Sequence, residues 1–239
     1  MSLTGQGAAP APDGHLLPLQ CDTFAIYYVW DADTVRTGTL VDVLRADGDR
    51  LIRVFDQADH ALGPEFDSVI SRMGDLAPVA YHGASDARTA HLQYGASSIT
   101  GWLRRENGDS VSLDVTRPAV VYDGFSYDLV VRASALKEGY QLTVPIFVLG
   151  PNSIVPVTGG VTGSEAVNGH DCWVFAADFA GLPVTFWIDK KTRALRRQFL
   201  RIRKNGGALF VTPAEPREVG HPAGWPRPIH SSRSAPGRM

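Results

Sequence analysis

Asparagine-glycine and aspartate-glycine pairs separate short β-prone runs along this chain, and they constrain its fold more than any other feature. Asn168-Gly169 opens the stretch 165–212, and Asn205-Gly206 lies near its end. Both central positions of a type I′ hairpin turn need a positive φ angle, which this pair adopts readily. We therefore predict a β-meander here, with strands at residues 171–179, 184–189, 194–203 and 208–212.

The earlier part of the chain carries the same turn chemistry. Asp47-Gly48 and Asn107-Gly108 each separate two β-prone runs. The connections are short, and short connections between neighbouring strands indicate antiparallel pairing, since parallel strands need a long crossover. Further strands are predicted at residues 24–30, 37–44, 50–55, 76–81, 89–94, 99–105, 110–115 and 140–149.

Two segments interrupt the strand pattern and favour helix. In residues 64–73, apolar side chains at Phe66, Val69, Ile70 and Met73 repeat at helical spacing. Residues 123–137 carry a second apolar stripe, with a capping side chain before it and glycine after it. We therefore expect a mainly β fold, a strongly curved antiparallel sheet or unclosed β-barrel with one or two helices against its concave face.

Both faces of the meander need cover, because apolar residues occur on both sides of its strands. Such a sheet can leave an apolar groove on its concave side, and pockets often lie in barrel mouths. The alternative is that the aromatic side chains simply fill the core against the helix at 123–137. The candidate lining residues for an apolar ligand are Trp173, Phe175, Phe179, Phe186 and Trp187.

Basic residues crowd the predicted hairpin at 190–204, which is the sharpest charge feature of the chain. Guanidinium groups bind phosphates and acidic partners. The alternative is a solvated strand face whose charges pair with carboxylates on neighbouring strands. The candidates for an anion or an acidic protein partner are Arg193, Arg196, Arg197, Arg201 and Arg203.

Signals for catalysis, a metal or a cofactor are weak, so we predict none of them. His170, Asp171 and Cys172 are consecutive, but adjacent strand residues point to opposite faces, which separates a base from a nucleophile. Two polar sets, Asp86 with Arg88 and His91, and Asp56 with Asp59 and His60, lack a recognised metal-ligand spacing.

Charge, cysteine content and chain ends bound the remaining possibilities. A net charge of -2 and a pI near 6.4 argue against a nucleic-acid role. No run is long enough for a membrane helix, and no signal peptide pattern is present.

Cys21 and Cys172 are expected as buried thiols, with one disulfide as the alternative. We expect a flexible arm at 1–20, a single antiparallel β domain at 21–212 and a Pro/Arg-rich tail at 213–239.

Three segments, 122–139, 163–167 and 186–193, resemble an uncharacterised bacterial family of cell-envelope proteins with the open β-barrel of the lipoprotein-carrier (LolA-like) type. The resemblance covers roughly the second half of the chain. It implies a curved sheet with a helix in its mouth, a hydrophobic cavity and a place in the cell envelope or periplasm. A cytoplasmic location stays open, because no leader is recognisable.

Together these observations predict a non-enzymatic binding or carrier protein for an apolar or amphipathic, lipid-like ligand. The first alternative is a structural or protein-interaction module with a filled core that uses the basic hairpin. The second is a hydrolase of unknown substrate near His170 or His91.

Overall fold

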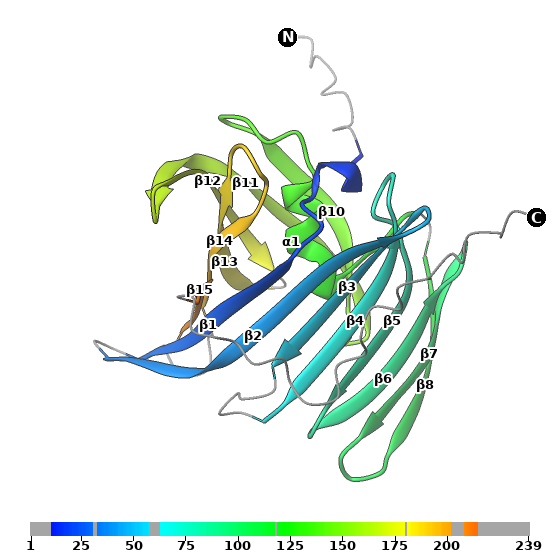
Figure 1. Cartoon of the computed structure of the whole chain (residues 1–239). Helices are drawn as coiled ribbons and strands as arrows, with labels where there is room; N and C mark the ends of the chain where they lie inside the picture. Colours follow the sequence, from blue (N-terminus) through cyan, green and yellow to red (C-terminus); the bar gives the residue numbers. More distant parts are fainter. Residues whose placement is uncertain are drawn as a thin grey trace, which may run out of the picture.

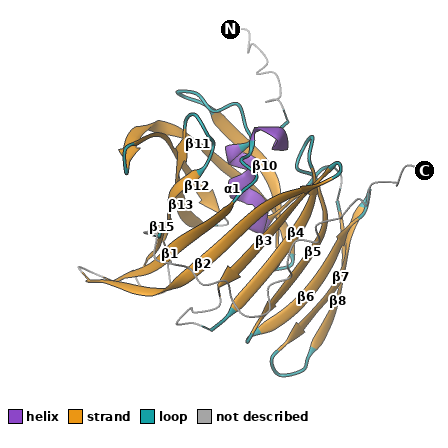
Figure 2. Cartoon of the chain, in the orientation of Figure 1, coloured by secondary structure: helices purple, strands orange, loops and turns teal. Residues whose placement is uncertain are grey.

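In a computed structural model of the chain, the described residues are 11–30, 33–57, 63–117, 119–179, 181–201 and 208–214. They form one continuous sheet of fifteen strands that curves strongly around a short helix (Figure 1, Figure 2). Within the described residues the two edge strands, β8 (Ser110–Thr116) and β9 (Tyr122–Asp123), do not pair, so the barrel stays open. The predicted fold, a mainly β and strongly curved unclosed sheet, is confirmed.

The first half of the sheet is an antiparallel meander in chain order, as the turn signals predicted. Gly48 and Gly108 have φ angles of 60° and 86°, the conformation for which glycine suits these turns. Each strand pairs with the next one along the chain. These strands are β1 (Cys21–Trp30), β2 (Asp33–Asp47), β3 (Arg50–Gln57), β4 (Glu65–Arg72), β5 (Pro78–Ser85), β6 (Arg88–Tyr94) and β7 (Ser98–Arg105), followed by β8.

The helix predicted at residues 64–73 is wrong, because this segment forms strand β4. Its side chains alternate in burial, with Asp67, Val69 and Ser71 turned inward. The buried set shares only Val69 with the predicted helical stripe, and two of its three members are polar, so the apolar spacing of the sequence did not reveal the strand. Pairing with β3 on one side and β5 on the other satisfies the backbone of β4 and overrides the local helical signal.

The second half returns from the far edge toward the middle of the sheet. Asn168 and Gly169 both have positive φ angles, 49° and 80°, as the predicted turn requires. The pair β9 and β10 is parallel, whereas the other neighbours are antiparallel. The strands are β10 (Gln141–Val148), β11 (Ser153–Val167), β12 (His170–Phe179), β13 (Leu182–Asp189), β14 (Leu195–Arg201) and β15 (Ala208–Pro213), of which β11 was not predicted.

Strands from opposite ends of the chain meet in the centre of the sheet. β1 pairs with β15 in antiparallel register, from Phe24 opposite Pro213 to Val29 opposite Ala208. The sheet is therefore two meanders joined through the first and last strands. This join brings β1, β2 and β3 next to β13, β14 and β15 around one concave interior (Figure 1).

One α-helix is formed by the described residues, α1 (Tyr127–Arg132), which lies inside this curve and follows the 3₁₀ turn η2 (Gly124–Ser126) (Figure 2). All six residues of α1 are buried. Asp123 caps the turn, since its carboxylate accepts a hydrogen bond from the Phe125 N–H at 2.8 Å. The predicted helix at 123–137 is thus present but shorter, and it covers the concave face as expected.

The segment 11–20 packs against the interior, although it was expected to belong to a flexible arm. It contains the 3₁₀ turn η1 (Gly14–Leu16), whose Gly14 N–H donates to the Met73 carbonyl at 2.9 Å. Leu17 is buried in the main hydrophobic cluster. Residues 1–10 and 215–239 lie outside the described residues, and so does most of the predicted tail.

The cysteines are both free thiols, so the alternative of a disulfide between them is wrong. Cys172 is buried as expected, whereas Cys21 is exposed. Burial raises the pKa of both thiols, and neighbouring carboxylates raise it further. None of the helices formed by the described residues has the length and apolar character needed to cross a bilayer.

Candidate functional site

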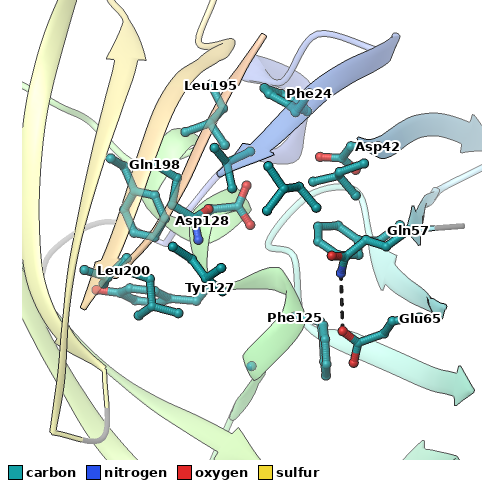
Figure 3. Close-up of a pocket in the computed structure, with 18 of the residues that line it drawn as sticks. Phe24, Asp42, Gln57, Glu65, Phe125, Tyr127, Asp128, Leu195, Gln198 and Leu200 are labelled. Carbon is teal, nitrogen blue, oxygen red and sulfur yellow. Dashed lines mark hydrogen bonds between the residues drawn. The ribbon is translucent and has the colours of Figure 1, made fainter. Parts of the chain in front are cut away.

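A cavity of about 280 Å³ lies on the concave side of the sheet, between η2, α1 and the strands that join the two meanders (Figure 3). This volume is near the lower end for small-molecule sites. Most of its wall is apolar, and aromatic rings come from six separate elements, β1, β3, η2, α1, β12 and β13. Representative apolar lining residues are Phe24, Ile26, Val184, Phe186, Leu200 and Leu209.

A group of charged side chains closes one part of the cavity wall. The Arg53 Nε and Nη2 atoms donate to the two Asp42 carboxylate oxygens at 2.9 and 2.8 Å. Nη1 and Nη2 also donate to Asp128 at 2.5 and 3.3 Å, and Nη1 donates to the Phe125 carbonyl at 2.5 Å. A guanidinium has five N–H donors. Arg53 therefore uses its full donor capacity within the protein.

Arg132 extends this group, which we name the buried ion network: Asp42, Arg53, Asp128 and Arg132. Arg132 Nη1 lies 3.3 Å from Asp128, and its Nε donates to the Arg193 carbonyl at 2.8 Å. Burial alone would lower the pKa of Arg53, but the carboxylates of Asp128 and Asp42 hold it above its ordinary value. The network is electrically balanced and joins β2, β3, α1 and the turn before β14.

A second cavity, of about 240 Å³, adjoins the first. Both cavities share Gly124, Phe125 and Phe179 in their walls, so η2 and the end of β12 divide them. The second cavity also contains the side chains of Arg88 and Asp123. The interior thus offers one mostly apolar chamber next to one with charged groups.

Two carboxyl groups are buried beside this second cavity, and both have a pKa above the ordinary value of an aspartate. Asp67 accepts a hydrogen bond from the Tyr81 hydroxyl at 2.6 Å, and Asp123 accepts one from the Tyr94 hydroxyl. Burial raises the pKa of Asp67 to about 7 and that of Asp123 to about 6, although these hydrogen bonds oppose the shift.

The structure brings only part of the predicted aromatic lining to the first cavity. Phe179 and Phe186 line it, and both pack against Tyr127 of α1, with ring centroids 5.5 and 5.9 Å away. Phe175 is fully buried in the core. Trp173 packs against the same core from its rim, below the ammonium of Lys190.

Trp187 lies on the opposite face of the sheet from Phe186, since adjacent strand residues alternate. Its indole N–H donates to Glu165 at 2.7 Å, and the Arg197 guanidinium stacks over its ring at 5.1 Å. It is therefore placed outside the cavity.

Two of the five predicted basic residues, Arg196 and Arg197, pair with carboxylates. Arg196 lies 3.2 Å from Asp189, and Arg197 lies 3.3 Å from Glu165. Arg193 has a positive φ angle of 62° in the turn before β14, and Arg201 is exposed at the end of that strand. Arg203 lies outside the described residues. For Arg196 and Arg197 the pairing fits the alternative of a charge-balanced strand face, and anion or partner binding by the other three residues stays a prediction.

In the polar set at residues 170–172, the His170 ring pairs with Asp189 and not with the Cys172 thiol. His170 Nδ1 lies 2.8 Å from Asp189, and the Cys172 thiol donates to the His170 carbonyl and not to its ring. No group of three or more potential metal ligands occurs within the described residues. His60 and Asp59 lie outside them.

The sequence analysis did not predict the charged residues of the cavity wall. Arg53, Asp42 and Asp128 are 11 to 86 positions apart on different elements, and no spacing rule links them. One signal was available, because Arg53 interrupts an otherwise apolar run in a predicted strand. A charge at a buried strand position needs a partner.

Comparison with known proteins places these features in context. The family described as a protein of unknown function, DUF3108, matches residues 23–209. A β-barrel-like protein of the DUF1849 family from Brucella abortus has a similar structure, with a TM-score of 0.51, 11% identity, and coverage of 81% of this chain and 96% of its own. No curated protein sequence matches the chain.

Two other solved structures show weaker likeness. A putative outer membrane lipoprotein-sorting protein domain from Vibrio parahaemolyticus has a TM-score of 0.28 at 11% identity, and a DUF1329 family protein from Desulfovibrio piger has 0.25 at 9%. Each match covers 84% of this chain and 85% of the other. Of the three, only the Brucella structure superposes closely enough to indicate a shared fold.

Proposed function

Because the chain belongs to DUF3108, a family of unknown function, we propose a function from its interior: non-enzymatic binding or transport of an apolar or amphipathic, lipid-like molecule. The observation that carries the proposal is the apolar cavity of about 280 Å³ on the concave side of an unclosed barrel. A concave, mostly apolar pocket with a few polar groups is the usual form of a small-molecule site. We place the protein in the bacterial cell envelope, where such a carrier would meet lipids.

A cavity-filling substitution tests this proposal. Leu200 and Gln198 of β14 line the cavity, so Phe199 between them points to the other face. We expect the delipidated protein to bind one molecule of lauric acid, and Leu200→Trp to weaken that binding about tenfold or more by occupying the space. Phe199→Trp places a tryptophan on the opposite face of the same strand, so this variant should bind lauric acid like the unaltered protein. Isothermal titration calorimetry and native mass spectrometry measure both.

The outcome also separates the alternatives. If the unaltered protein takes up no lauric acid and carries no ligand on purification, the interior works as a filled core, and the structural or interaction module is favoured. If Leu200→Trp and Phe199→Trp weaken binding equally, the ligand does not occupy this cavity.

A further inference from the structure

Arg88 stands at the boundary between the two cavities and differs from Arg53 in how it is paired. It lines the second cavity, while its partner Glu65 lines the first. Arg88 Nη2 donates to Glu65 at 3.2 Å, and its guanidinium lies 5.7 Å from the centroid of the Phe125 ring that divides the cavities. Figure 3 shows Glu65 held by Gln57, with Phe125 in the same wall.

The pairing leaves Arg88 able to exchange its partner. Within the described residues its one side-chain hydrogen bond uses one of five donors, whereas Arg53 uses all five. The side chains of Arg88 and Glu65 are 25% and 33% exposed, and an ion pair that reaches solvent contributes little stability. An incoming anion can therefore replace Glu65 at small cost.

We propose that the ligand is a single-chain amphipath with an anionic head group, its chain in the apolar cavity and its carboxylate or phosphate on Arg88 in place of Glu65. This inference rests on the proposed function. A guanidinium binds carboxylate and phosphate through two parallel hydrogen bonds, which favours these head groups over neutral ones. The cavity volume suits one chain.

Binding of four lauryl probes to Arg88 variants tests the inference. The probes are lauric acid, lauroyl-lysophosphatidate, neutral monolaurin and lauryl trimethylammonium, each measured by calorimetry below its micelle concentration. Arg88→Met should weaken binding of at least one of the two anionic probes about tenfold and leave monolaurin within about twofold. Glu65→Gln should strengthen binding of that anionic probe, because it removes the competing carboxylate. Whichever anion responds more identifies the head group as carboxylate or phosphate.

Two control variants distinguish loss of the Arg88 contact from a general loss of positive charge and from misfolding. Arg104→Met removes one positive charge from the neighbouring strand β7, where Arg104 is exposed, and should leave all affinities unchanged. The double variant Glu65→Gln with Arg88→Met removes both members of the pair, so Glu65 is not left as a carboxylate without its partner. It should still show the loss for the anionic probe even if Arg88→Met alone folds poorly.

Different binding results would contradict the head-group site and the carrier function. If the unaltered protein binds monolaurin and the anionic probes equally, and Arg88→Met changes none of them, the head-group site is overturned while the carrier proposal stands. Tighter binding of lauryl trimethylammonium than of either anion also overturns it. Absence of binding by all four probes overturns the proposed function itself.

Discussion

Arg53→Met is expected to lower the free energy of unfolding by about 3–5 kcal/mol, because it leaves two buried carboxylates without their main counter-charge. Asp42 and Asp128 are both less than 10% exposed and accept four of the five Arg53 hydrogen bonds. Domains of this kind have total stabilities of about 5–15 kcal/mol. Urea unfolding followed by linear extrapolation measures the change.

A matched pair on the surface provides the control for this prediction. Arg72 forms an ion pair with Asp75, and the Arg72 side chain is 55% exposed. Arg72→Met should therefore cost no more than about 1 kcal/mol. Adding Asp42→Asn to Arg53→Met should recover part of the loss, since it removes the buried carboxylate that pairs with Arg53, while Asp128 keeps Arg132 as its counter-charge. Equal effects of Arg53→Met and Arg72→Met would show that the buried ion network does not stabilise the fold.

The sequence predicted most strands because hairpin turns and side-chain alternation are local properties. Asn168-Gly169 and Gly48 fix their turns through positive φ angles that few other residues adopt. Local signals fail where long-range pairing decides. Strand β4 lies between two partners that its own residues do not reveal, and the pairing of β1 with β15 joins residues nearly 190 positions apart.

The site was harder to predict than the fold for the same reason. An aromatic residue looks the same in sequence whether it fills a core or lines a cavity: Phe175 and Phe186 lie opposite each other on neighbouring strands, yet of the two only Phe186 lines the cavity. Arg88 was noted as part of a polar set, but its position at the cavity boundary depends on Glu65 and on Phe125 of η2. These contacts join three elements, so no single window of sequence contains them.

Stability is expected to fall as the pH rises from 5 to 8, and Asp67 should account for much of the change. Burial raises the pKa of Asp67 from 3.8 to about 7. From pH 5 to about pH 7 the unfolded chain has lost the Asp67 proton while the folded protein still binds it, so stability falls as the pH rises and levels off above the folded pKa. A shift of this size corresponds to an effect on the order of 3 kcal/mol. Asp123, whose pKa burial raises to about 6, adds a change of the same sign.

Asp67→Asn isolates the contribution of this carboxyl group. Asparagine keeps an oxygen that accepts from the Tyr81 hydroxyl and resembles the protonated acid in shape, but it does not titrate. We expect the stability of the variant relative to that of the unaltered protein to increase by about 2–3 kcal/mol between pH 5 and pH 8. Burial lowers the pKa of His82, so its titration changes stability in the opposite direction. Because His82 is present in both proteins, its contribution cancels in the difference between their stabilities. Urea unfolding of both proteins at pH 5 and pH 8 decides the matter, since parallel losses of stability would mean that Asp67 is ionised in the folded state throughout.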